Sequence, residues 1–425
     1  MLRLLILALT VVAAAASDSL RLLREMDLGA APHHYYERKT RDRFARLQGE
    51  LEAGRVVLDR SSEKAFLVSL LGALEIPVSS QMLVFSTTSL QLSLITPSNP
   101  RALYFNEDTY LGFIPGGKIE IVSIDPELGG IFYILDIPKS AGASLNIDRS
   151  RRCMNCHSGS ETGYVPGLTI KSVVPGTRGG SIDAFRVDVT GHGIPLSERF
   201  GGWYLTGEHG LTNHWANAIG RMFKGEVTKE PVIPGERFSY AKYPVAGSDI
   251  LPQLIHEHQA GFVNRALQAG YVARMHLHEA EKTGDELGAE QQREIDFFVM
   301  ELARYILFVE EAALPAGGIT GDAKFREDFL KNRKAGRSGA SLKDFDLKRR
   351  IFKYPVSYMI YTPMFEALPE VVKKGVMREL RAGLRDGNGN GDDGKNGSDG
   401  TYAHISKEEK RVIREILAET MGWEF

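Results

Sequence analysis

The sequence predicts an α+β fold that is predominantly α-helical and contains one small antiparallel β segment. Residues 82–137 hold short β-branched or aromatic runs separated by Pro, Gly and Asn, a pattern typical of strands joined by turns. Residues 249–282 and 289–314 instead repeat apolar side chains at the 3.6-residue spacing of helices. We therefore expect the β segment in the N-terminal half and a helical C-terminal half.

The first residues have the pattern of a secretory signal peptide over residues 1–17. Arg3 supplies a positive charge, residues 4–12 are apolar, and the alanines at 13–16 offer small side chains for cleavage. No later segment approaches the run of about 18 uninterrupted apolar residues that a membrane span requires. The sequence thus predicts an exported, soluble protein without a membrane span.

The segment 18–148 is expected to be helical first and β-rich later. Residues 20–54 are charged, with an apolar stripe at helical spacing. A Ser-Ser pair at 61–62 caps a second predicted helix, which ends at residue 74 ahead of Pro77. Short strands are predicted at residues 83–85, 90–95, 103–105, 119–124 and 131–137.

The only two cysteines of the chain stand in the pattern C-x-x-C-H, as Cys153, Cys156 and His157. In this motif two thiols can each add to a vinyl group of haem, while the adjacent imidazole ligates the iron. The motif therefore predicts one covalently attached haem c, with His157 as its proximal ligand. Because such haem is attached on the outer side of the bacterial membrane, the motif and the signal peptide together indicate the periplasm.

Three other interpretations of the motif stay open. A disulfide between the two cysteines, as in thioredoxin-like proteins, lacks the expected strand–helix context and leaves the histidine unexplained. A zinc site would need a fourth ligand and usually a second cysteine pair, which the sequence does not contain. Chance placement is the third.

Residues 149–225 are expected to form a cytochrome-c-like haem region. The arginine-rich run 149–152 could pair with haem propionates or form a solvated charge run. The Pro166 carbonyl is a candidate acceptor for a hydrogen bond from the His157 imidazole. Residues 199–217 combine four glycines with several aromatic side chains, which suits either close approach to a flat porphyrin or a compact loop.

The candidates for the sixth iron ligand are His209, His214, His258 and a methionine, Met222 or Met275. The distance from His157 to His214 along the chain resembles the proximal-to-distal spacing of small cytochromes c. His258 lies on the apolar face of the helix predicted at 249–282. Each histidine also has an ordinary interpretation, because loop histidines satisfy local hydrogen bonds and a histidine on an apolar helix face is often a core residue.

The C-terminal part is expected to be a helical region, 226–385, followed by an acidic Gly/Asn/Asp linker, 386–400, and a last helix within 401–425. Further helices are predicted at 325–332, 356–361 and 369–384, and a capping box at 406–409 opens the last one. The linker begins like the calcium loop D-x-[DN]-x-[DN]-G, but its twelfth position is Gly397, where that loop needs a bidentate Glu. A flexible linker and a calcium site are both kept as interpretations.

Several segments of the chain resemble a group of exported bacterial cytochrome-c-like proteins that carry one C-x-x-C-H motif in a long chain. The matching segments are SSQMLVFS (79–86), PRALYFN (100–106), CMNCH (153–157) with VPG (165–167), GGWY (201–204), EHQ (257–259) and YAH (402–404). They run through nearly the whole mature chain, so the resemblance implies one integrated unit that binds haem and transfers electrons. It implies no established substrate, and the calcium-like insert departs from the pattern.

The first functional hypothesis is periplasmic electron transfer to a redox partner protein, which requires a filled sixth iron position. The net charge of −2 gives no reason to expect nucleic acid as a partner. The alternative is a haem enzyme or small-ligand sensor whose sixth position is open or weakly held, which the large non-haem part favours. The single motif disfavours dihaem peroxidases, and a third hypothesis is an interaction protein in which haem is structural. We expect an electron carrier rather than a substrate-specific enzyme.

Overall fold

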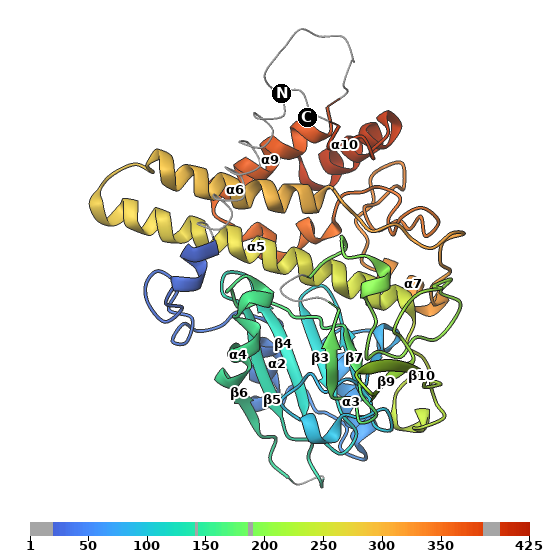
Figure 1. The fold of residues 1–425 in the computed structure, drawn as a ribbon. Coiled ribbons are helices and arrows are strands. Elements are labelled where there is room, and N and C mark those ends of the chain that lie inside the picture. Colours follow the sequence, from blue (N-terminus) through green and yellow to red (C-terminus); the bar gives the residue numbers. More distant parts are fainter. Residues whose placement is uncertain (1–19, 141–142, 186–189, 386–399) are drawn as a thin grey trace.

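The computed structural model describes residues 20–140, 143–185, 190–385 and 400–425. The expected signal peptide (1–17) and the calcium-like loop (386–397) therefore lie outside the described residues. Figure 1 shows a β-sheet whose upper end meets a stack of long helices, α5, α6, α9 and α10, while α2 and α3 lie against the sheet itself.

The bounds of these elements are as follows. Residues 20–25 are helical. The labelled helices are α2 (Arg43–Glu52), α3 (Glu63–Ala73), α4 (Met154–His157), α5 (Ile250–Thr283), α6 (Ala289–Ile306), α7 (Ala323–Leu330), α8 (Pro363–Glu366), α9 (Glu370–Gly383) and α10 (Lys407–Met421). The strands are β1 (Met82–Val84), β2 (Arg101–Phe105), β3 (Thr109–Phe113), β4 (Ile119–Asp125), β5 (Gly129–Leu135), β6 (Ile147–Arg149), β7 (Val173–Pro175), β8 (Ser181–Ala184), β9 (Ala218–Phe223) and β10 (Glu226–Pro231).

Strands β1 to β6 form one antiparallel sheet in which each strand pairs with the next along the chain. Successive side chains of a strand point to opposite faces, so the sheet has two different surfaces. One surface carries Tyr104, Leu111 and Ile121, which belong to a hydrophobic core that also contains side chains of α2 and α3. The other surface is called the front face below and carries Arg101, Leu103, Glu120, Val122 and Phe132. Strand pairs β7–β8 and β9–β10 form two separate small sheets.

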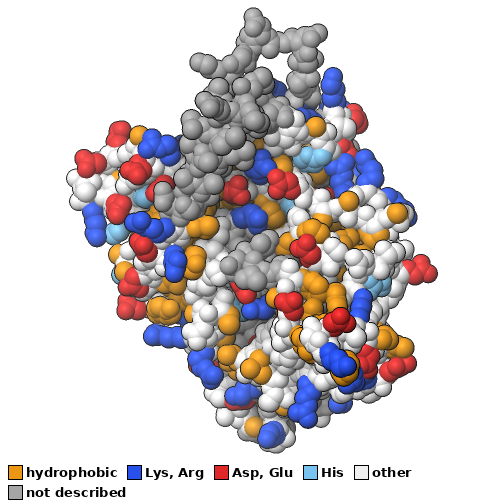
Figure 2. All heavy atoms as spheres, viewed as in Figure 1, with side chains coloured by type: hydrophobic (Ala, Val, Ile, Leu, Met, Phe, Trp, Pro, Cys, Tyr) orange, Lys and Arg blue, Asp and Glu red, His pale blue; other side chains and the backbone are white. Residues whose placement is uncertain are grey.

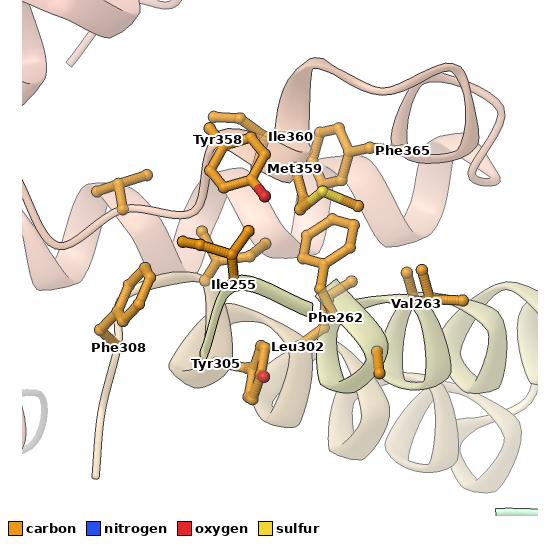
Figure 3. Packing of buried hydrophobic residues seen from close by; sticks show 14 of the residues in the cluster. Ile255, Phe262, Val263, Leu302, Tyr305, Phe308, Tyr358, Met359, Ile360 and Phe365 are labelled. Carbon is orange, nitrogen blue, oxygen red and sulfur yellow. The ribbon is translucent and has the colours of Figure 1, made fainter. Parts of the chain in front are cut away.

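Helix α5 is the central element of the helical part. Its N-cap Asp249 accepts a hydrogen bond from the N–H of Leu251, and the helix ends at Gly284, whose φ of 74° suits a C-terminal glycine. Figure 3 shows Phe262 of α5 facing the core beneath Phe365, with Tyr305 of α6 close by. None of the helices in the described ranges is long and apolar enough to cross a membrane.

Four predicted helices are confirmed, and three of them begin at a side-chain cap. The helix predicted at 61–74 is α3, which starts after Ser62, and the helix predicted at 249–282 is α5. The segment 369–384 forms α9. The last helix, α10, has the predicted capping box, because Ser406 accepts from the N–H of Glu409 while Glu409 accepts from the N–H of Ser406.

The predicted fold class is wrong in its proportion of helix to strand and in the structure expected for residues 149–225. The protein is a mixed α+β structure with a six-stranded sheet in its N-terminal half, not a predominantly helical chain with a small β segment. Residues 149–225, expected to be cytochrome-c-like, contain the single-turn helix α4, short 3-10 turns and strands β7 to β9. The sequence motif specifies only its own helical turn, and the structure around it is built from strands.

Several local predictions are also wrong. The helix predicted over 20–54 is interrupted by turns at 28–37, where Pro32 cannot donate a backbone hydrogen bond, and α2 starts only at residue 43. The strand predicted at 90–95 is a loop with a 3-10 turn at 92–94. Strands β3 and β6 were not predicted, and the helix predicted over 289–314 ends at Ile306.

Candidate haem site

The C-x-x-C-H motif forms a single helical turn at the edge of the sheet. Strand β6 leads into a 3-10 turn, Arg151–Cys153, which continues directly into α4. The N–H of Ser150 donates to the carbonyl of Phe132 on β5 at 2.9 Å, and the side chain of Met154 is buried in the same hydrophobic cluster as Phe132. The sheet therefore anchors both the entry and the middle of the motif.

Both thiols of the motif are free, and they differ in exposure. Cys156 is exposed and Cys153 is half-buried. Burial raises the pKa of the Cys153 thiol, so this group is protonated at neutral pH. The turn thus carries two free thiols three residues apart, directly followed by the histidine.

The imidazole of His157 is oriented by the backbone of Gly167. Its Nδ1 lies 2.9 Å from the Gly167 carbonyl oxygen, and the N–H of Gly167 donates to the His157 carbonyl at 2.8 Å. A carbonyl can only accept, so Nδ1 carries the proton in this bond. Burial lowers the pKa of His157 and keeps the ring neutral, which leaves the lone pair of Nε2 available to a metal.

The acceptor differs by one residue from the predicted one. The carbonyl of Pro166 accepts the N–H of Gly130 on β5 at 2.8 Å, so it faces the sheet and not the histidine. Pro166 therefore positions the loop, and Gly167 makes the contact with His157.

Helix α5 holds the loop that orients His157. Asn264 makes two hydrogen bonds to the backbone of Leu168, accepting from its N–H at 2.8 Å and donating to its carbonyl at 2.9 Å. One turn farther along α5, Gln268 donates to the carbonyl of Thr162 at 3.3 Å. A Cβ atom on Gly167 would lie 2.3 Å from Asn264 Oδ1, so only glycine fits at this close approach.

The front face of the sheet provides an apolar surface beside His157. The ring of Phe132 lies 4.7 Å from the ring of His157, centre to centre. The half-exposed Val122 on β4 lies directly opposite Phe132, and the half-exposed Leu103 lies farther across the face on β2. Arg101 also lies on this face and forms an ion pair of 2.9 Å with Glu120. The charge of Arg101 lowers the pKa of His157, whereas the charge of Glu120 raises it.

Two of the predicted propionate-binding arginines line a cavity next to the motif. Arg149 donates to the carbonyl of Tyr35 at 2.8 Å, and Arg151 lies 4.9 Å above the ring of Tyr36. The cavity has a volume of about 160 Å³ and is also lined by Phe132. Both guanidinium groups are thus held near the turn that carries the cysteines.

The predicted sixth-ligand candidates lie in two other environments. His209 and His214 lie in the loop before β9 in an edge-to-face contact, with their ring centres 5.1 Å apart, and Nδ1 of His209 accepts the N–H of Leu211. His258 is fully buried in α5. Its Nδ1 lies 2.8 Å from Nδ1 of His192, and its Nε2 lies 2.9 Å from the Ser357 hydroxyl. Both ring nitrogens of His258 are therefore engaged in hydrogen bonds.

The methionine candidates lie on β9 and on α5. Met222 is 57 % exposed on β9, and Met275 is half-buried near the end of α5.

Sequence reasoning missed His256, which lies over the front face. Its ring is 5.4 Å from the rings of both Phe105 and Tyr110, and it has no hydrogen-bond partner among the described residues. The signal was its helix position: His256 shares a side of α5 with Val263 and Leu267, whereas His258 points to the opposite side.

Within the described ranges, no three His, Cys, Asp or Glu side chains are grouped as a metal site. A c-type haem requires at most two iron ligands from the protein, because the porphyrin supplies the other four. Comparison with protein-family models, curated proteins and solved structures found no match to this chain.

Proposed function

We propose that this protein carries one covalent haem c, attached through Cys153 and Cys156 with His157 as proximal ligand, and that it transfers electrons. The observation that supports this most directly is the hydrogen bond from His157 Nδ1 to the Gly167 carbonyl. In haem and other metal sites, such a bond fixes the tautomer and the orientation of the ligating imidazole. A histidine with a merely structural role would not need Nε2 to remain free.

The two cysteines fit the attachment chemistry. The S–H of each thiol adds across a vinyl C=C bond, so that an S–C bond forms and the hydrogen goes to the neighbouring carbon, with no oxidant or reductant required. This addition needs reduced cysteines, and both Cys153 and Cys156 are free thiols. When bound, the haem supplies a one-electron Fe(III)/Fe(II) couple.

The surrounding residues determine how that couple would behave. Gly167 and Phe132 hold the His157 ring from two sides and restrict its rotation. Arg101 contributes positive charge beside a partly apolar surface, which favours the reduced state of a nearby iron. These residues tune the electron affinity of the site rather than carry out a separate reaction.

Export to the periplasm and docking to a redox partner protein belong to the same proposal. The signal-peptide pattern at 1–17 supports export, and it accords with a motif whose cysteines must be loaded outside the cytoplasm. Figure 2 shows positive and negative side chains interspersed over the visible face, with hydrophobic side chains between them. A surface with mixed charges suits brief docking to a redox partner protein better than a surface with one strong charge does.

The test is to produce the full chain in a bacterium that attaches c-type haem in its periplasm. We expect haem that stays bound through denaturing electrophoresis, at one per chain by pyridine haemochrome, and a reversible one-electron potentiometric titration. The control is the double variant C153S/C156S, which should keep the far-UV circular dichroism of the parent and lose the covalent haem. A correctly exported parent chain without covalent haem would refute the proposal. A high-spin spectrum that shifts with CO would favour the enzyme or sensor alternative.

A further inference from the structure

We propose that the C-terminal helices form a second binding site, for a small organic anion that joins an aromatic ring to phosphate groups, as a nucleotide does. The site is a cavity of about 810 Å³ lined by α9, by residues 360–366 and by the end of α10. Small-molecule pockets commonly have volumes of about 300–1,000 Å³. The described residues that line this cavity include none of the C-x-x-C-H motif, and Figure 1 shows α9 and α10 at the end of the molecule away from α4. The proposal therefore does not depend on the haem.

Three aromatic side chains, called the aromatic floor below, line the cavity. They are Tyr361, Phe365 and Trp423. The ring centres of Phe365 and Trp423 lie 6.2 Å apart, and the Tyr361 hydroxyl lies 2.8 Å from the Thr420 hydroxyl of α10. Phe365 is buried, whereas Tyr361 and Trp423 are only half-buried and keep accessible ring surface. A flat ligand ring can stack on such surface.

Positive charge dominates the rest of the lining. Two carboxylates line the cavity, those of Glu366 and Glu370. The cations of the lining are Lys334, Lys373, Lys374, Arg378, Arg381 and Arg385. The Lys334 ammonium lies 4.7 Å from the centre of the Tyr361 ring, so the cations reach the aromatic floor. An anionic group is therefore favoured in this cavity.

The cations on α9 share one side of the helix. Lys374, Arg378, Arg381 and Arg385 follow one another at intervals of four, three and four residues, which places them on one face. Like charges at this spacing destabilise a helix. The helix dipole favours a cation in the last turn, which accounts for Arg381 but not for Lys374. Helix stability thus does not explain the cluster, whereas a bound anion would offset its repulsion.

Neighbouring carboxylates neutralise only part of this charge. Arg378 pairs with Asp296 at 3.3 Å and with Glu379 at 3.1 Å. Lys373 pairs with Glu370 at 3.3 Å. These two cations therefore have their own counter-charges.

The other four cations keep their charge available. Nε of Arg381 donates to the carbonyl oxygen of Glu424 at 2.8 Å, which holds the guanidinium near Trp423 without neutralising it. Lys334, Lys374 and Arg385 form no ion pair with any residue that the structure describes, and all three are exposed. Cations of this kind can turn toward phosphate oxygens.

The combination of rings and cations selects the class of ligand. An inorganic anion would leave the aromatic floor in water, and an uncharged aromatic compound would leave the cations without a counter-charge. Lys374 and Arg381 lie about 10 Å apart along the helix axis, a span that suits two or more linked phosphate groups. The carboxylate of Glu366 can accept hydrogen bonds from hydroxyl groups at the other end of the ligand. A nucleoside diphosphate supplies all of these parts.

The experiment titrates the full chain with ADP, adenosine and pyrophosphate by isothermal titration calorimetry at low ionic strength. ADP should bind at one site per chain, with a Kd at least about tenfold lower than that of adenosine or pyrophosphate, because only ADP uses both the rings and the cations. No binding of ADP at millimolar concentration would overturn the proposal. Equal affinities for ADP and pyrophosphate would also overturn it, since the cavity would then hold an adventitious ion only.

Two variants locate the binding in this cavity. K374A/R385A removes two exposed cations, so it should keep the circular dichroism spectrum and the Tm of the parent and weaken ADP binding on the order of tenfold. The matched control K407A removes an exposed lysine of α10 outside the lining and should bind ADP as the parent does. W423L should weaken the binding of ADP but not that of pyrophosphate. Parental ADP affinity in K374A/R385A or in W423L would place the binding elsewhere and overturn the assignment.

Discussion

Nδ1 of His192 and Nδ1 of His258 lie 2.8 Å apart in the protein interior, and both rings stack against Tyr305 and Phe308. Burial lowers the pKa of both histidines, so the pair is neutral and one Nδ1–H donates to the other ring. His258 was a candidate iron ligand on sequence grounds. Its contacts give it a structural role between α5, the loop at 192 and Ser357.

The first prediction follows from this pair. The substitution H258A should lower the free energy of unfolding by about 2–4 kcal/mol, because it leaves a buried nitrogen of His192 without a partner and removes the bond between His258 and the Ser357 hydroxyl. Urea denaturation measures this loss, and the haem spectrum should not change. A variant of parental stability that has lost its low-spin spectrum would instead make His258 the ligand.

The second prediction concerns the helix that holds the haem loop. N264A removes two hydrogen bonds to Leu168 and should cost about 1–3 kcal/mol. Hydrogen exchange should become faster at residues 162–168. The control Q268A loses one longer bond, to Thr162, and should have the smaller effect on both measurements. Equal effects of the two variants would contradict the role given to Asn264.

A third prediction tests the close approach at Gly167. G167A places a Cβ atom 2.3 Å from Asn264 Oδ1, which forces the loop or the helix to shift. We expect a loss of more than about 1 kcal/mol in stability, and a partial recovery in the double variant G167A/N264G, which removes the clashing amide. Purely additive effects in this double-mutant cycle would show that the contact does not matter.

The fourth prediction is a pH dependence at Glu311, which lies away from the haem site. Burial raises the pKa of its carboxyl to about 7, while the side chain accepts the N–H of Ile351 at 3.1 Å. The folded state therefore binds this proton between about pH 4.5 and 7, where the unfolded chain has released it. Its contribution to stability is full below the unfolded pKa and is lost as the pH rises through the folded pKa.

The variant E311Q keeps the acceptor and removes the titration. It should be about as stable as the parent at pH 4.5 and more stable by about 1–3 kcal/mol at pH 8. Thermal denaturation across this range checks the difference. A stability difference that does not change with pH would contradict the assignment to Glu311.

The fifth prediction concerns the reduction potential. R101Q removes a positive charge from the front face and should lower the potential, on the order of tens of mV, because oxidised iron is then less strongly disfavoured. Spectroelectrochemistry of the matured protein measures the shift. The control R411Q removes an exposed charge from α10 and should leave the potential within error of the parent. A rise in potential for R101Q would place Arg101 away from the iron.

The segments 90–95 and 109–113 show why the sheet was only partly predictable. Residues 90–95 alternate like a strand, yet β1 pairs directly with β2, so the intervening segment finds no partner and leaves Leu90, Leu92 and Leu94 exposed. Strand β3 is buried on both sides and shows no alternation. Strand β6 is three residues long, and β5 is its only strand partner among the described residues. Strand pairing is a property of the whole chain.

What the sequence determined by itself was local. Side-chain periodicity and caps located α3, α5, α9 and α10, and the spacing of Cys153, Cys156 and His157 predicted the haem attachment turn. Such features depend on residues within a few turns of one another. The tertiary structure decided which carbonyl orients His157, which histidine of α5 faces the sheet, and that a six-stranded sheet supports the motif. Those outcomes depend on contacts between segments about 10 to 150 residues apart, whose register and burial no local pattern encodes.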